Sequence, residues 1–175
     1  LKVILTDSTW ENISLARMEG LETYYGNPIS EHADRNLNLI GLGKVLAMSG
    51  RSNLDILACL RFKSEFEVKN IYELKSNIDE NINEKHLAST RHRGHQLFSE
   101  NIDYGELTYL LRQGAEIKST HISDEFTFEH YLEKYDGRVI PLFAIDRKQL
   151  IQIFVANGHM KPEPGWKIIG IIQAE

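Results

Sequence analysis

The first 74 residues alternate between short apolar runs rich in β-branched residues and longer stretches with helical periodicity. The apolar runs predict strands at residues 2–6, 21–25, 44–48 and 70–74. The stretches between them predict helices at residues 10–19, 30–39 and 52–66. A strand that continues through a helix into a neighbouring strand forms a right-handed crossover and makes the two strands parallel. The alternation therefore predicts an α/β fold with a parallel sheet.

The predicted helices begin and end at recognisable capping residues. Ser8 is followed three residues later by Glu11, which is the spacing of a capping box, and Gly20 ends this helix. Ser30 is expected to cap the second helix. These signals support the predicted boundaries.

The sequence pattern changes after residue 74, where the predicted parallel sheet ends. Residues 75–96 lose apolar periodicity and are expected to be a linker. Asp103 with Glu106 predicts a helix that ends at Gly114. The remaining pattern predicts a strand, a helix and three more strands in an antiparallel meander, at residues 115–121, 126–135, 139–145, 150–156 and 166–172. The second part is thus expected to be a small α+β domain with an antiparallel sheet.

Composition excludes several classes of function. The net charge of −5 provides no field that would recruit nucleic acid. A single cysteine, Cys59, leaves no internal disulfide and no cysteine-rich zinc site, which fits a reducing compartment such as the cytoplasm. The apolar runs are far shorter than the roughly 18 residues of a membrane span. The sequence therefore predicts a soluble chain without a nucleic-acid partner.

Three predicted strands end in residues that suit a nucleotide. Asp7, beside Ser8, follows the first strand, where an acid in a dinucleotide-binding fold accepts hydrogen bonds from ribose hydroxyls. Gly26 and Asn27 follow the second strand and could approach an adenine ring. Ser49 follows the third. Each has a simpler interpretation, because an acid after a strand often caps the next helix and glycine with asparagine often forms a plain turn.

The Gly-x-Gly-x-x-Gly loop that would hold the phosphates does not occur in the sequence. The prediction is therefore a Rossmann-like sheet that lacks its first strand and its Gly-rich loop. The chain has no initiator methionine and opens within a strand, so we expect it to be a piece of a longer polypeptide in which the missing strand precedes Leu1.

Other polar and aromatic residues give weaker signals. His86, His92 and His95, with Arg91 and Arg93, could bind a metal or an anion, although a solvated linker explains them equally well. The aromatic residues Trp10, Trp166, Tyr24 and Tyr25 are expected in a core or an interface. No nucleophile elbow, His-Glu-x-x-His motif or paired carboxylates appear, which predicts a protein that is not an enzyme.

The segments Asp7-Ser8-Thr9-Trp10-Glu11-Asn12 and Ala16-Arg17-Met18-Glu19-Gly20-Leu21-Glu22-Thr23-Tyr24-Tyr25-Gly26-Asn27-Pro28 resemble the nucleotide-binding domain of potassium-transport regulators, the KTN or RCK family. The likeness is strongest to the cytoplasmic tail of bacterial sodium/proton antiporters of the cation:proton antiporter family. Further likeness lies in Arg91-His92-Arg93, residues 113–117 and 141–146, and Pro164-Gly165-Trp166. Residues 1–74 match the nucleotide-binding part, 75–96 form the linker, and 97–175 match the small α+β regulatory domain.

This resemblance implies a nucleotide-sensing domain on the cytoplasmic side of the inner membrane. Asp7 would contact the ribose of NAD or AMP, and Gly26-Asn27 would lie near adenine, with Asn27 replacing an acid of the family. The implied partners are the transmembrane antiporter domain of the same polypeptide and a second copy in a homodimer. Two alternatives stay open: a fragment of an NAD-dependent oxidoreductase, and a protein-interaction domain whose nucleotide site has decayed.

Overall fold

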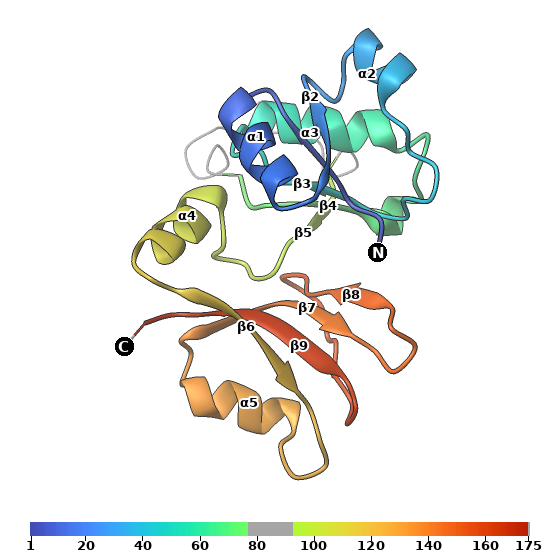
Figure 1. The fold of residues 1–175 in the computed structure, drawn as a ribbon. Helices are drawn as coiled ribbons and strands as arrows, with labels where there is room; N and C mark the ends of the chain where they lie inside the picture. The colour runs from blue at the N-terminus through green and yellow to red at the C-terminus, as the bar shows by residue number, and fades with distance from the viewer. Residues whose placement is uncertain (77–92, 175) are drawn as a thin grey trace, which may run out of the picture.

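The computed structural model describes residues 1–76 and 93–174. Two small parallel sheets occupy one part of the molecule, and a separate four-stranded antiparallel sheet occupies the other (Figure 1). The predicted combination of a helix-bearing parallel part with a second, antiparallel part is confirmed at this level.

The first parallel sheet contains two strands joined by a helix. Its elements are β1 (Ile4–Asp7), α1 (Trp10–Met18) and β2 (Glu22–Tyr25). The strands pair in parallel, with Asp7 opposite Tyr25 at their carboxyl ends. The expected capping box is wrong: Thr9 is the N-cap and makes no side-chain cap, because the Asp7 carboxylate instead accepts the Thr9 N–H.

The second parallel sheet has the order β3-β4-β5. The elements leading to and forming it are α2 (Glu31–Asn36), β3 (Val45–Ala47), α3 (Ser52–Phe62), the 3-10 turn η1 (Val68–Asn70), β4 (Ile71–Glu73) and β5 (His95–Gln96). Ser30 caps α2 as predicted, since its hydroxyl accepts the Ala33 N–H at 3.1 Å. The helices α2 and α3 end earlier than predicted.

The segment 95–98 joins the two parts of the molecule. His95 and Gln96 pair in parallel with β4, and the Leu97 N–H donates to the Glu73 carbonyl at 2.8 Å. On its other side Leu97 forms an antiparallel bridge with Val155. Residues 77–92 of the predicted linker lie outside the described part of the chain, and the domain division stays a prediction, but residues 95–96 belong to a sheet.

The antiparallel sheet has the order β6-β9-β7-β8. Its part of the chain comprises α4 (Tyr104–Arg112), β6 (Glu116–His121), α5 (Phe128–Tyr135), β7 (Val139–Ile145), β8 (Ile151–Ile153) and β9 (Lys167–Ile172). The predicted meander is wrong, because β9 lies between β6 and β7. The physical reason is burial: β9 is apolar on both faces and takes a central position, whereas the polar, exposed β6 takes an edge.

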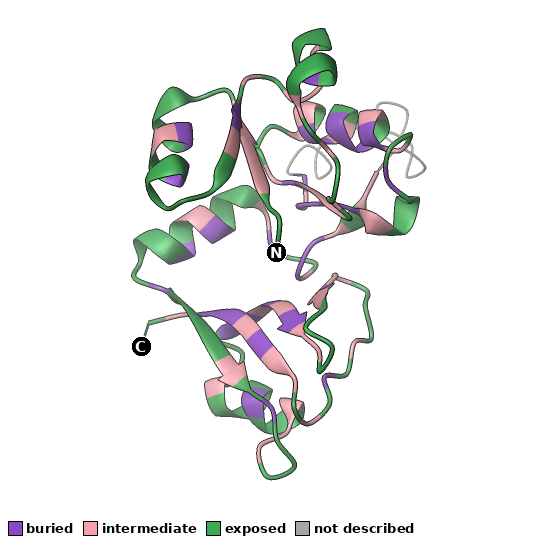
Figure 2. Ribbon diagram, turned by 45° about the vertical axis from the view of Figure 1, so that its right-hand side comes forward, coloured by how far each residue is buried: buried purple, intermediate pink, exposed green. Residues whose placement is uncertain are grey.

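Both faces of the antiparallel sheet are covered. On one face Tyr131 of α5 packs in a cluster with Ala144 of β7 and Ile168 of β9. The other face packs, in a second cluster, against residues of β4, α4 and the segment 95–98. Figure 2 shows β9 buried or half-buried along its whole length, with no exposed residue. A register shift between Pro141 and Phe143 changes the face to which successive β7 side chains point.

Tyr131 provides a test of the core beneath α5. Its side chain is fully buried, its hydroxyl finds no hydrogen-bond partner among the described residues, and burial raises its pKa to about 12. The hydroxyl packs against Gly170, where a Cβ atom would lie 2.6 Å from it. An unpaired buried hydroxyl costs stability that a phenyl ring does not.

We therefore expect Tyr131→Phe to raise the free energy of unfolding by about 1 kcal/mol, measured by urea denaturation. Tyr135→Phe, on the same helix and only half-buried, is the matched control and should change stability by less. Equal or lower stability of Tyr131→Phe would contradict the assignment of an unpaired hydroxyl.

Candidate functional site

The candidate site lies at the carboxyl ends of β1 and β2. In parallel sheets of α/β proteins, ligands bind outside the carboxyl ends of the strands. Asp7 closes β1, Tyr25 closes β2, and the two residues are opposite each other in the parallel register. The structure thus brings Asp7 and Ser8 close to the turn that begins at Gly26.

The Asp7 carboxylate is held by the first turn of α1. Its Oδ1 accepts the Thr9 N–H and its Oδ2 accepts the Asn12 side-chain amide, each at 2.7 Å. Burial acts to raise the pKa of Asp7, but hydrogen bonds from Asn12, Thr9 and Ser8 outweigh it and leave the pKa below its usual value. The group is therefore ionised at neutral pH. The donors of Ser8, Thr9 and Asn12 thus surround this carboxylate and hold it in place at the end of β1.

Gly26 and Asn27 form the turn after β2. Gly26 has φ of 144°, and a Cβ atom there would lie 3.2 Å from the Tyr24 ring, so the position favours glycine. Its N–H donates to the Asp7 carbonyl at 2.8 Å and ties the turn to β1. The Asn27 side-chain oxygen accepts the Ile29 N–H at 3.1 Å. Asn27 is thus a turn-forming residue, as in the simpler interpretation of the sequence.

Ser49 does not join these residues. It follows β3, in the other parallel sheet, where its N–H donates to Asp55 at 3.0 Å and its hydroxyl accepts the Arg51 N–H at 3.1 Å. These contacts build the turn before α3. The predicted grouping of three strand ends is therefore found only for the first two.

Two aromatic side chains border the site and were expected to be in a core or an interface. Trp10 begins α1 and Tyr25 ends β2, and each is 50% exposed. Their rings meet edge to face, with centroids 5.4 Å apart. The Arg17 guanidinium lies 5.3 Å from the centre of the Trp10 ring. Tyr24, in contrast, is buried as predicted.

A separate polar pocket of about 50 Å³ lies at the carboxyl ends of β3 and β4. Glu73, only 3% exposed, accepts a hydrogen bond from Arg93 Nε at 2.6 Å and the weak thiol bond of Cys59 at 3.7 Å. Burial raises the pKa of Glu73 despite the opposing effect of Arg93. Burial and the nearby Glu73 raise the pKa of Cys59 to about 12, which confirms its interpretation as a core residue. The pocket has room for a few water molecules.

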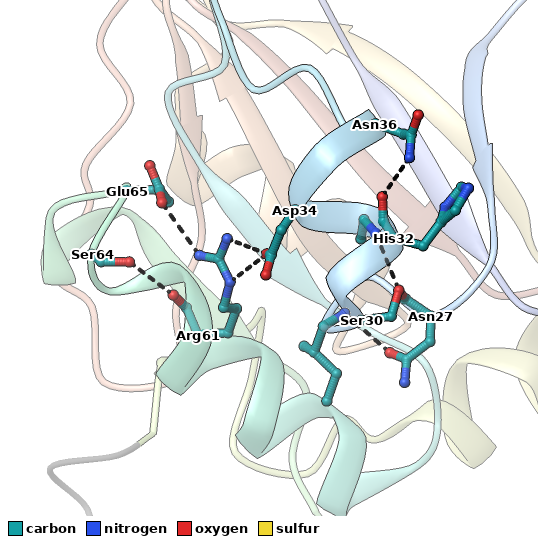
Figure 3. Close-up of polar contacts among 10 residues, drawn as sticks. Asn27, Ser30, His32, Asp34, Asn36, Arg61, Ser64 and Glu65 are labelled. Carbon is teal, nitrogen blue, oxygen red and sulfur yellow. Dashed lines mark hydrogen bonds and ion pairs between the residues drawn. The ribbon is translucent and has the colours of Figure 1, made fainter.

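A larger groove of about 270 Å³ lies between α2 and α3 and is lined by none of the predicted site residues. Arg61 of α3 spans it. Its Nε donates to Asp34 of α2 at 3.0 Å, and its Nη1 donates to Glu65 at 3.3 Å (Figure 3). The same view shows Asn27 and Ser30 linked in the turn before α2. This network fixes α2 against α3.

Metal binding finds no support in residues 1–76 and 93–174, which contain no group of three or more histidine, cysteine or acidic side chains suited to a metal ion. His86, Arg91 and His92 lie outside the described residues. His95 lies in β5, with its ring 5.8 Å from that of Tyr72. No helix within the described ranges is both long and apolar enough to span a membrane.

Comparison of the chain with models of protein families gives no match, and comparison with curated proteins gives none either.

The Glu73–Arg93 pair makes a testable contribution to stability. Removal of Arg93 would leave Glu73 buried without its cation, and breaking a buried pair in this way typically costs about 3–5 kcal/mol. The pKa of Glu73, already raised, would rise further. An acid whose folded pKa exceeds its unfolded value loses stability as pH rises from the unfolded to the folded pKa. Arg93→Ala should therefore be more destabilising at pH 7 than near pH 4.5, as measured by urea denaturation.

Lys69→Ala is the matched control, because Lys69 and Glu67 form a solvent-exposed ion pair at 2.7 Å, and such pairs contribute little to stability. Adding Glu73→Gln to Arg93→Ala should remove most of the pH dependence. If Arg93→Ala lowered the free energy of unfolding as little as Lys69→Ala does, the stabilising role of the Glu73–Arg93 pair would be contradicted.

Proposed function

We propose that this chain is a nucleotide-sensing regulatory domain of a monovalent cation/proton antiporter, located on the cytoplasmic side of the membrane. The observation that carries the proposal is the state of Asp7. It is an ionised carboxylate at the carboxyl end of a parallel strand, held in place by the first turn of α1. In dinucleotide-binding folds an acid at a strand end of this kind accepts hydrogen bonds from ribose hydroxyls.

The strand order supports a Rossmann-like relationship. The two parallel sheets have the orders β1-β2 and β3-β4-β5. The doubly wound fold has the strand order 3-2-1-4-5-6. If its strand 1 is left out, β2 and β1 correspond to strands 3 and 2, and β3, β4 and β5 correspond to strands 4, 5 and 6. The apolar strand β1 is only half-buried along its whole length, which suits a strand that has room for a second neighbour.

Regulation would follow from different ligand affinities of two conformations of the domain. A nucleotide that prefers one conformation raises its population, and a transporter attached to the domain would respond to that shift. The apolar cluster shared by β4 and the antiparallel sheet offers a packed connection between the two parts of the chain. The domain is proposed to act as a homodimer and not as an enzyme.

A protein-interaction domain is the second candidate. Leu15 and Met18 lie on the outward face of α1, and they are 59% and 72% exposed. Exposed apolar side chains that neighbour one another are common in protein interfaces. The interaction-domain proposal would be favoured over nucleotide sensing if no nucleotide bound to the chain.

Asp7→Ala tests the leading proposal. We expect the substitution to weaken the binding of AMP or NAD by about 1.5–3 kcal/mol, the usual contribution of a hydrogen bond to a charged group, as measured by calorimetry. In the intact antiporter, the same substitution should blunt the effect of nucleotide on cation/proton exchange in vesicles.

Glu22→Ala is the control, because Glu22 is an exposed acid at the opposite end of β2. Since Asp7 also supports the first turn of α1, the melting temperature of each variant should be recorded without nucleotide. Equal affinities of the original chain and Asp7→Ala would reduce Asp7 to a local structural role.

A further inference from the structure

We propose that Trp10 and Tyr25 form a stacking platform for the base of a purine nucleoside whose ribose is bound by Asp7. This inference rests on the proposed nucleotide binding and specifies which residues contact the base. It transfers that contact from Asn27, whose side-chain oxygen is committed to its own turn.

The first argument is position. Tyr25 is the parallel register partner of Asp7, and neighbouring strands lie about 4.8 Å apart. Trp10 begins the helix whose first turn holds the Asp7 carboxylate, through Thr9 and Asn12. The aromatic rings and the acid thus belong to the same strand ends. A nucleoside carries its base and its ribose hydroxyls on one compact unit and can contact both.

The second argument is preorganisation. The edge of one ring meets the face of the other at an interplanar angle of 80°, so each ring restrains its neighbour. Arg17 lies against the Trp10 ring and is itself fixed by a hydrogen bond from its Nε to the Thr23 hydroxyl at 2.8 Å. A ring that is already fixed loses little conformational entropy when a ligand stacks on it.

The third argument is exposure. Trp10 and Tyr25 are each half-exposed, although Ile13 and Ala16 of α1 are fully or almost fully buried. A planar base presents an apolar face that stacks on such a ring, while its edges remain hydrated. The exposed pair Leu15 and Met18 points to a different side of α1, so the aromatic pair is distinct from that apolar surface.

The chain contains only two tryptophans, which permits a direct test. In a Trp166→Phe variant Trp10 is the only tryptophan, and Trp166 lies against the cluster beneath α5, apart from the proposed site. Adenosine should quench the emission of Trp10 saturably in this variant. D-ribose at the same concentrations should not, because it lacks a base.

Calorimetry then measures the contribution of the ring. Trp10→Ala should weaken adenosine binding about 5- to 150-fold, the range expected for loss of one base-stacking contact. Trp10→Phe should recover part of the affinity. Met18→Ala, which removes an exposed apolar side chain from the same helix, should leave the affinity unchanged.

Three outcomes would overturn the proposal. If Asp7→Ala weakens adenosine binding but Trp10→Ala does not, nucleotide binding stands and the stacking platform fails. If the original chain binds neither adenosine nor AMP, the platform and the proposed function fail together. If Trp10 emission changes with protein concentration in the absence of adenosine, and adenosine has no effect, the rings belong to a protein interface. Stacking without any effect of nucleotide on the antiporter would support the platform and overturn the regulatory function.

Discussion

The segment 95–98 is the constraint on which the rest of the structure depends, because it is bonded to both kinds of sheet. One side pairs with β4, and the other forms backbone hydrogen bonds with residues 154–156 next to β8. Leu97, at the centre, is fully buried in the cluster that spans the two parts. Opening this segment would expose backbone groups of two sheets and the apolar cluster together. The parallel and antiparallel parts are therefore coupled by hydrogen bonds as well as by packing.

The sequence predicts the positions of the helices and strands better than it predicts which strands pair with one another. Apolar periodicity places β1, α1 and β2 almost correctly, and the Asp103 cap places the start of α4, because those signals are local. The sheet order of the second part was missed because a meander is the simplest connection, whereas the position of β9 is decided by burial of both its faces. β5 was missed because two residues carry no periodicity; its pairing depends on contact with β4 across a long interval of sequence.

In the candidate site, too, the sequence predicts local features but not contacts between residues far apart in the chain. Asp7 and Gly26 could be placed at strand ends from the pattern alone, since a carboxyl end is defined by its own strand. The contacts of Trp10 with Tyr25 and of Glu73 with Arg93 join residues 15 and 20 positions apart, and no local signal indicates them. Exposure also differs from expectation. An aromatic residue is usually buried, and the sequence does not reveal that α1 turns Trp10 toward solvent.

The buried thiol behind Glu73 has a consequence for how the chain reacts. Thiolates, not thiols, are attacked by alkylating agents and oxidants, and Cys59 is the only cysteine of the sequence. With no exposed surface and a pKa of about 12, it is chemically silent while α3 covers β4. Loss of that packing would expose an ordinary, reactive cysteine. The thiol of Cys59 would thus report local unfolding at the place where α3 packs on β4.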